Sequence, residues 1–169
     1  MKKKALFIFV LVICLSFGSC STKNAFSCED ILGEMLKVSG ENVEGNGIIY
    51  FANADEGTLG YLSQEDKELI YGKNRVEQLF DCKKIEDYAM FFSTRGVGEI
   101  AIFKCYSRAY TKETARMCME RADEIKVLLR KSEWREKSEG IKVVIYKEYV
   151  LMIFAEQPHK VENRFKNLI

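Results

Sequence analysis

The sequence is poor in the residues that catalytic and metal sites usually need. It has a single histidine, His159, and a single proline, Pro158, which stand together near the C-terminal end. Zinc sites are built from clustered cysteines and histidines, and the sequence contains no Cys-x-x-Cys pair and no such cluster. A hydrolytic triad needs a nucleophile, a base and an orienting acid, and nothing beside His159 supplies them. We therefore expect no metal and no cofactor, and we interpret His159 as an exposed residue at the start of a last helix.

Neither sign of charge is in excess. The chain has 26 basic and 25 acidic side chains, a formal net charge of +1. Three of the basic residues, Lys2, Lys3 and Lys4, open the chain, and without them 23 basic residues face 25 acidic ones. Nucleic-acid-binding domains carry a basic footprint, so we expect no nucleic-acid partner. One proline and 11 glycines give no sign of a long disordered stalk.

The N-terminus has the pattern of an export signal. The three lysines precede an apolar run of about 13 residues, 5–17, which is followed by Gly18, Ser19 and Cys20. A transmembrane helix needs roughly 20 apolar residues, so this run is too short to span a bilayer comfortably. The sequence 17–20 resembles the bacterial lipobox, in which the chain is cut before a cysteine whose sulfur carries a diacylglycerol. Phe17 departs from it, because leucine is usual there.

Three interpretations of this leader remain open. In the one we prefer, residues 1–19 are a lipoprotein signal peptide, Cys20 is the site of lipid attachment, and residues 20–27 form a short tether. The alternatives are an uncleaved anchor helix and a cleaved signal without lipid. All three place the domain outside the cytoplasm, and the preferred one holds it on the extracytoplasmic face of the cell membrane, with the membrane as its partner through the lipid anchor.

Residues 28–169 are predicted to form a single α+β domain. Helices are expected after Ser27 and Ser63, each of which has an aspartate three residues later, as in a capping box. The remaining elements follow from apolar periodicity and turn residues: a short strand or loop at 48–51, strands at 88–92 and 99–106, a long helix capped by Thr111, a polar linker at 132–140, strands at 141–146 and 149–155, and a last helix from Pro158.

These elements predict a four-stranded, mainly antiparallel sheet packed with helices. Its two hairpins give the order strand-strand-helix-strand-strand-helix, preceded by N-terminal helices. Residues 143–146 and 150–154 are apolar on both faces, whereas a sheet with one exposed face would alternate. Either helices cover both faces, or one face awaits a partner.

Short motifs in a fixed order resemble a known family. The motifs are Leu69-Ile70-Tyr71-Gly72, Val76, Tyr88 to Ser93, Glu99-Ile100-Ala101-Ile102-Phe103-Lys104, the long charged helix and Tyr149-Val150-Leu151-Met152-Ile153. Together they resemble the domain-of-unknown-function family 4358, small exported lipoproteins mostly of clostridial-type bacteria. The resemblance covers residues 27–168 and departs at Lys147, where the family tends to have glycine. It implies location and architecture without implying chemistry.

Four cysteines remain in the predicted domain. Cys105 falls in an apolar strand and Cys118 on the apolar face of the long helix, so we interpret both as buried free thiols, which behave as small hydrophobic residues. In an exported chain a disulfide bridge between Cys28 and Cys82 is the other arrangement to consider.

One polar pair stands out in the first hairpin. Glu99 opens the central strand, across the turn from Arg95. The functional interpretation is a polar site at the hairpin tip. The interpretation we prefer is a turn-stabilising ion pair, worth well under about 1 kcal/mol.

Two functions follow from these observations. The first is a non-catalytic, membrane-anchored envelope module that binds a protein, a peptide or a wall component. An uncovered patch of Tyr146, Tyr149, Met152 and Phe154 would support it. The alternative is a cell-envelope hydrolase that uses carboxylate or cysteine residues, which requires a deep pocket with convergent polar groups.

Overall fold

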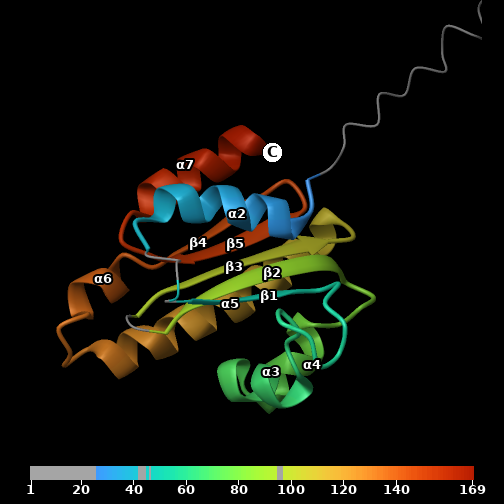
Figure 1. The fold of residues 1–169 in the computed structure, drawn as a ribbon, viewed down its shortest axis with the longest axis horizontal. Helices are drawn as coiled ribbons and strands as arrows, with labels where there is room; N and C mark the ends of the chain where they lie inside the picture. Colours follow the sequence, from blue (N-terminus) through green and yellow to red (C-terminus); the bar gives the residue numbers. More distant parts are fainter. Residues whose placement is uncertain (1–25, 42–44, 46, 95–96) are drawn as a thin grey trace, which may run out of the picture.

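The domain is an antiparallel sheet between two layers of helices (Figure 1). The computed structural model describes residues 26–41, 45, 47–94 and 97–169. The predicted signal peptide, Cys20 and Arg95 lie outside these residues. In chain order the elements are α2 (Cys28–Ser39), β1 (Gly47–Phe51), α3 (Gln64–Tyr71), α4 (Lys73–Leu79), β2 (Ile85–Ser93), β3 (Glu99–Cys105), α5 (Arg108–Leu129), α6 (Arg135–Glu139), β4 (Lys142–Tyr146), β5 (Tyr149–Phe154) and α7 (Pro158–Leu168).

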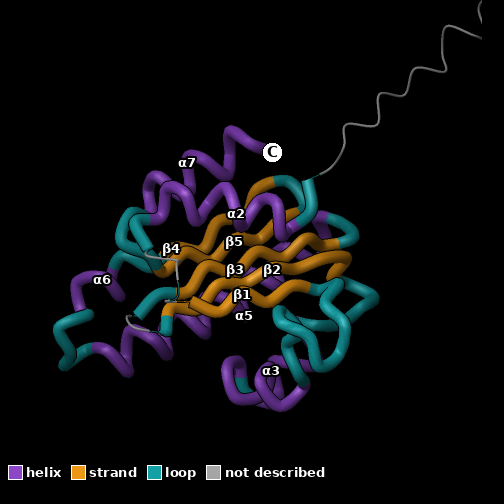
Figure 2. The backbone as a smooth tube through the Cα atoms, in the orientation of Figure 1, coloured by secondary structure: helices purple, strands orange, loops and turns teal. Residues whose placement is uncertain are grey.

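The α+β class and both predicted hairpins are confirmed, but the predicted number of strands is wrong. Within the described residues the sheet has five strands in the order β1-β2-β3-β5-β4, each pair antiparallel (Figure 2). The additional strand is β1, which pairs with β2 so that Ile48 lies opposite Phe92. The apolar run 48–51 has four residues, too few to be told from a loop by periodicity alone.

Helices cover both faces of the sheet, which explains why the central strands are apolar on both. On one face α2 and α7 pack over a buried cluster that includes Phe91, Ile153 and Phe165. On the other face α5, together with α3 and α4, packs over a second cluster that includes Phe103 and Met152. Every residue of β5 is buried.

The apolar residues of the second hairpin therefore do not form the open patch that would have supported a binding module. Tyr149, Met152 and Phe154 are buried, and Tyr146 is half-buried against Phe165 of α7. Of the two alternatives for this hairpin, the structure has the one in which helices cover both faces.

Two of the three predicted helix caps are confirmed. The Ser27 and Ser63 hydroxyls accept hydrogen bonds from the backbone N–H groups of Asp30 (3.1 Å) and Asp66 (3.0 Å). The long helix does not begin at Thr111: Ser107 is its N-cap, and the Thr111 hydroxyl donates to the carbonyl oxygen of Arg108 at 2.9 Å inside the first turn. A threonine can make such a bond to a preceding carbonyl within a helix, so its presence alone does not mark the start.

Two short helices were also missed. α4 follows Gly72 directly, and α6 lies within the predicted polar linker 132–140. Helices of one or two turns gain most of their stability from packing, so their sequences carry little periodic signal. No helix in the described part of the chain is long and apolar enough to cross a membrane.

The four described cysteines are free thiols. Cys105 and Cys118 are buried in the core beneath α5, as expected of small hydrophobic residues. The bridge considered between Cys28 and Cys82 is not formed: the Cys28 side chain is buried between α2 and the sheet, whereas Cys82 faces solvent in the link before β2.

Candidate functional site

A groove runs along α5 on the side that faces α3 and α4. It consists of three adjoining depressions of about 340, 600 and 190 Å³. The first two share Arg75, Glu120 and Glu124, and the last two share Leu128. We call this feature the α5 groove; its walls are residues 71–75 on one side and residues 120–129 on the other, and Phe92 and Val97 line its far end.

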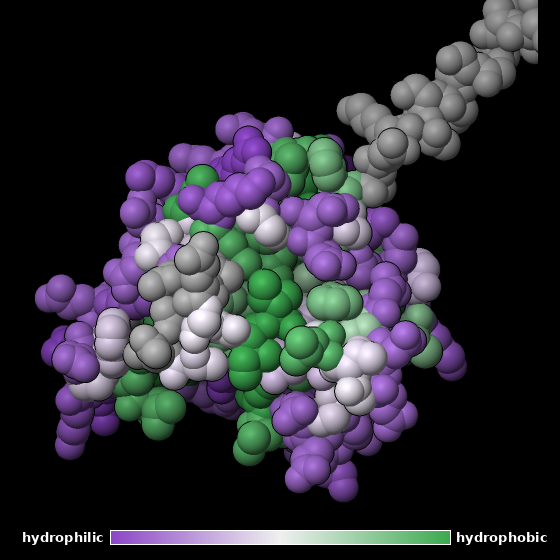
Figure 3. All heavy atoms as spheres, in the orientation of Figure 1, coloured by the Kyte–Doolittle hydropathy of each residue, from purple (hydrophilic) through white to green (hydrophobic). Residues whose placement is uncertain are grey.

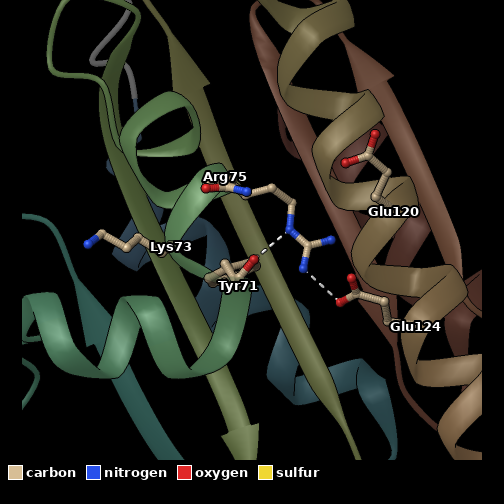
Figure 4. A pocket seen from close by; sticks show the side chains of 7 residues that line it. Tyr71, Lys73, Arg75, Glu120 and Glu124 are labelled. Atoms are coloured by element: carbon tan, nitrogen blue, oxygen red, sulfur yellow. Dashed lines mark hydrogen bonds and ion pairs between the residues drawn. The ribbon is translucent and has the colours of Figure 1, made fainter.

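The junction between α3 and α4 forms one wall. Gly72 has a φ of 79°, a left-handed conformation that favours glycine, and it lets the chain turn from one helix into the next. Arg75 then reaches across to α5 (Figure 4). Its Nε donates to the carbonyl oxygen of Tyr71, and its Nη2 donates to Glu124 Oε2 at 2.7 Å. The hydrogen bond to Glu124 raises the pKa of Arg75, so this pair fastens α4 to α5.

Beneath this wall lies a buried cluster of three polar side chains, Tyr71, Glu99 and Arg121, which we call the Glu99 cluster. The Tyr71 hydroxyl donates to Glu99 Oε1 at 3.0 Å, and it also lies 3.4 Å from the Met90 sulfur. Arg121 of α5 donates from Nε and Nη2 to Glu99 Oε2, each at 3.3 Å. Glu99 is only 2% exposed.

Burial and charge act in opposite directions on this cluster. Burial raises the pKa of Glu99, while Arg121 and the Tyr71 hydroxyl stabilise its charged form and partly offset the rise. Burial and the neighbouring Glu99 carboxylate raise the pKa of Tyr71 well above its ordinary value. Both carboxylate oxygens have donors, so the buried charge is paired rather than left uncompensated.

Glu99 lies in the β2–β3 hairpin, but its side chain is buried and its described partners come from outside the hairpin. The residue starts β3 beneath α5, and its partners Tyr71 and Arg121 lie 28 and 22 residues away in sequence. Arg95, the partner expected across the turn, lies outside the described residues. The sequence did contain a signal for Arg121, because it stands three residues after Cys118 and four before Ile125, on the inward face of α5.

The remaining chemically reactive groups lie elsewhere or are deactivated. Burial raises the pKa of the Cys118 and Cys28 thiols, which disfavours the nucleophilic thiolate. His159 is exposed on α7, on the opposite face of the sheet, with its Nδ1 2.9 Å from Lys142 Nζ. Among the described residues no group of three or more His, Cys, Asp or Glu side chains could hold a metal ion.

One part of the rim of the α5 groove is apolar. Val127 and Leu128, near the C-terminal end of α5, are 69% and 80% exposed, and they line its largest depression together with charged residues of α4 and α5. Ile125 and Phe154 line the 190 Å³ depression, whose wall also includes Glu99 and Arg121. The groove thus combines exposed aliphatic side chains with charged groups, of which Arg75 and Arg121 are paired with Glu124 and Glu99.

A second apolar area lies over β1 in the middle of the face seen in Figure 3. β1 is an edge strand, and one of its side chains, Ile48, is exposed. The Phe51 N–H donates to the carbonyl oxygen of Gly60 at 3.0 Å, so the following loop closes one end of this edge. Only a short length of strand remains for pairing, which makes the α5 groove the stronger candidate.

Comparison with known protein families, curated proteins and solved structures finds no match to this chain. The resemblance to family 4358 stays a prediction.

Proposed function

We propose that this chain is a lipid-anchored, extracytoplasmic lipoprotein whose domain binds another protein at the α5 groove without catalysing a reaction. The observation that carries the binding role is the exposed pair Val127 and Leu128 on the rim of a groove with an apolar lining. Contiguous exposed apolar side chains with a polar surround are typical of protein interaction surfaces.

The charges in the groove favour a protein segment over a small polar ligand. Arg75 is hydrogen-bonded to Glu124, and Arg121 is hydrogen-bonded to Glu99. A polar ligand or a glycan needs convergent groups to orient it, whereas these two arginines are already engaged by carboxylates of the domain. Exposed aliphatic side chains gain most from a partner that buries them, at about 25 cal/mol per Å² of apolar surface.

The location rests on the leader described above: three lysines, a short apolar run and Cys20 after two small residues. Its test is metabolic labelling with radioactive palmitate, followed by fractionation of the parent and of a Cys20→Ala variant. We expect label in the parent alone and release of the variant from the membrane. A parent without label that fractionates like the variant would show that the anchor does not exist.

The binding role is tested by a photo-crosslinking residue placed at Leu128 in intact cells. The matched control is the same residue at Leu59, which is 98% exposed but lies in the loop after β1. We expect one protein to crosslink from position 128 and not from 59. With that protein purified, Leu128→Asp should weaken binding by about tenfold or more, equal to about 1.4 kcal/mol, and Leu59→Asp should leave it unchanged. Equal effects at the two positions would contradict the groove as the binding site.

One observation favours the alternative, a cell-envelope hydrolase. Glu99 is a buried carboxylate with a raised pKa on the wall of a cavity, and such groups are frequent among catalytic acids. Both of its oxygens accept hydrogen bonds within the domain, which is why we prefer the structural role. A purified domain that hydrolyses wall material, and loses that activity in Glu99→Gln while still crosslinking from Leu128, would establish the alternative.

A further inference from the structure

Several loops and the start of α2 meet at one end of the sheet. The Tyr106 N–H donates to the carbonyl oxygen of Lys84 at 3.0 Å, which joins the link after β3 to the link before β2. The Cys105 N–H donates to the carbonyl oxygen of Glu148 at 2.8 Å, which brings the β4–β5 turn to the same place. We call this the α2-start end.

The start of α2 is fixed to this end by a carboxylate. The Cys28 N–H, the first of the helix, donates to Asp87 Oδ2 of β2 at 2.7 Å. The negative charge of Asp87 is also favourable here, because the N-terminus of a helix carries a partial positive charge. The chain that precedes the domain therefore leaves it at the α2-start end.

The length of chain before α2 limits how far this end can lie from a lipid on Cys20. Seven residue steps separate Cys20 from Ser27, and a fully extended chain covers at most about 3.6 Å per residue, or about 25 Å in all. A domain held by so short a segment has this end near the bilayer surface.

The exposed side chains at this end fit a lipid surface. Of the large apolar residues that are exposed in the described chain, the aromatic ones are Phe26, at 46%, and Tyr106, at 59%. Phe26 is adjacent to the helix cap, and Tyr106 lies in the link after β3, so both are at the α2-start end. Aromatic rings favour the boundary between headgroups and acyl chains. The charge at this end is mixed: Lys83 before β2 and Arg108 at the start of α5 are exposed, and so are Glu29 and Asp30 in the first turn of α2.

We propose that the α2-start end rests on the bilayer, with Phe26 and Tyr106 at the level of the lipid headgroups, and that the α5 groove therefore opens away from the membrane. This proposal rests on the lipid anchor proposed above. α5 begins at this end with Arg108 and has 22 residues, a length of about 33 Å. Leu128 is at its opposite end, and α6 lies on the far side of the molecule from the start of α2 (Figure 1).

A native thiol makes the orientation measurable. Cys82 lies in the link before β2, at the α2-start end, and it is exposed, whereas the other three described cysteines are buried. The full-length lipoprotein is labelled at Cys82 with a thiol-reactive fluorophore and reconstituted into vesicles of phosphatidylethanolamine and phosphatidylglycerol that carry a headgroup-linked quencher. The matched protein is Cys82→Ser with Leu128→Cys, which places the same probe at the far end of α5.

We expect several-fold stronger quenching of the probe at position 82 than at position 128. Adding Phe26→Ser and Tyr106→Ser should weaken the quenching at position 82, while circular dichroism shows an unchanged fold because both side chains are exposed. Equal quenching at both positions, or stronger quenching at 128, would overturn the orientation. Quenching at 82 that survives loss of both rings would overturn their role in the contact.

The same sample separates failure of this inference from failure of the anchor. If Cys20 carries lipid, its sulfur is blocked, so one fluorophore attaches per molecule and the mass includes the acyl chains. If it does not, Cys20 also reacts and the mass lacks the acyl chains, which overturns both proposals. Lipidated protein with an unquenched probe at Cys82 overturns the orientation alone.

Discussion

The Tyr71 hydroxyl donates to Glu99 Oε1 at 3.0 Å in a fully buried position, and Tyr71→Phe removes this donor while keeping the ring. A hydrogen bond to a charged group contributes about 1.5–3 kcal/mol. Because Arg121 still donates to the other carboxylate oxygen, we expect a loss in the lower part of that range, about 2 kcal/mol of unfolding free energy at neutral pH.

The pH dependence of this loss follows from the direction of the pKa shift. Burial raises the pKa of Glu99 in the folded state above its ordinary value of 4.5. The stability that the domain derives from Glu99 is therefore greatest below 4.5 and falls as the pH rises through the folded pKa. Tyr71→Phe removes a hydrogen-bond donor to the charged Glu99 carboxylate. The substitution therefore raises the folded-state pKa of Glu99 further, and the loss of stability with rising pH becomes larger. When Glu99 is protonated the lost bond is a neutral one, worth about 1 kcal/mol.

The assay is urea unfolding followed by the fluorescence of Trp134, the single tryptophan, at neutral pH and at about pH 4. Tyr61→Phe is the matched control, because the hydroxyl of this half-buried tyrosine has no hydrogen-bond partner among the described residues. We expect this control to change the free energy of unfolding by no more than about 0.5 kcal/mol. A loss below about 0.5 kcal/mol for Tyr71→Phe at neutral pH, or a loss that grows as the pH falls, would refute the reasoning.

Three further changes test other parts of the fold. Lys147 has a φ of 53°, alone among the described non-glycine residues, and its Nζ contacts the Ile169 carbonyl oxygen and the Tyr146 ring. Lys147→Gly and Lys147→Ala both remove these contacts, and in urea titration the glycine variant should be more stable than the alanine variant by about 1 kcal/mol; equal stability would mean that the turn is unstrained. Lys137 is largely buried between Glu41 (2.7 Å) and the carboxylate of Glu156. Lys137→Met should cost about 3 kcal/mol in the same titration, because the buried Glu41 carboxylate loses its cation and keeps the backbone N–H of Glu156 (3.1 Å); a loss under about 1 kcal/mol would contradict this. Hydrogen bonds from Lys142 and Lys166 lower the pKa of Glu162 to about 2. The stability that Glu162 contributes is therefore present above pH 4.5 and is lost as the pH falls from 4.5 towards 2. Glu162→Gln should flatten thermal stability measured across that range, and an equally steep decline would exclude this cause.

The elements that the sequence predicted well depend on short-range rules. Ser27 and Ser63 cap helices because a hydroxyl can reach the N–H three residues on, whatever the rest of the chain does. The two hairpins follow from apolar runs separated by a few turn residues. β1 and the one-turn α6 have too few residues for such a pattern, so packing against their neighbours decides them.

The candidate site depends on contacts that no local pattern contains. Glu99 was visible in the sequence as a charge at the start of an apolar strand, and the nearest opposite charge, Arg95, was the natural partner to expect. In the folded chain its donors come from α3 and α5. The α5 groove could not be predicted at all, because it exists only where α4 and the C-terminal half of α5 diverge over the sheet.

The sequence alone determined the longer helices, the two hairpins and which chemistry is scarce, because periodicity, capping residues and composition act within a few residues of each other. It also showed that two strands must be covered on both faces. Only the tertiary structure decided that β5 rather than β4 pairs with β3, that Glu99 is buried against Tyr71 and Arg121, and that Leu128 is left exposed beside a groove. These outcomes depend on how apolar surfaces far apart in the chain fit together when the core excludes water, and that fit is a property of the whole fold.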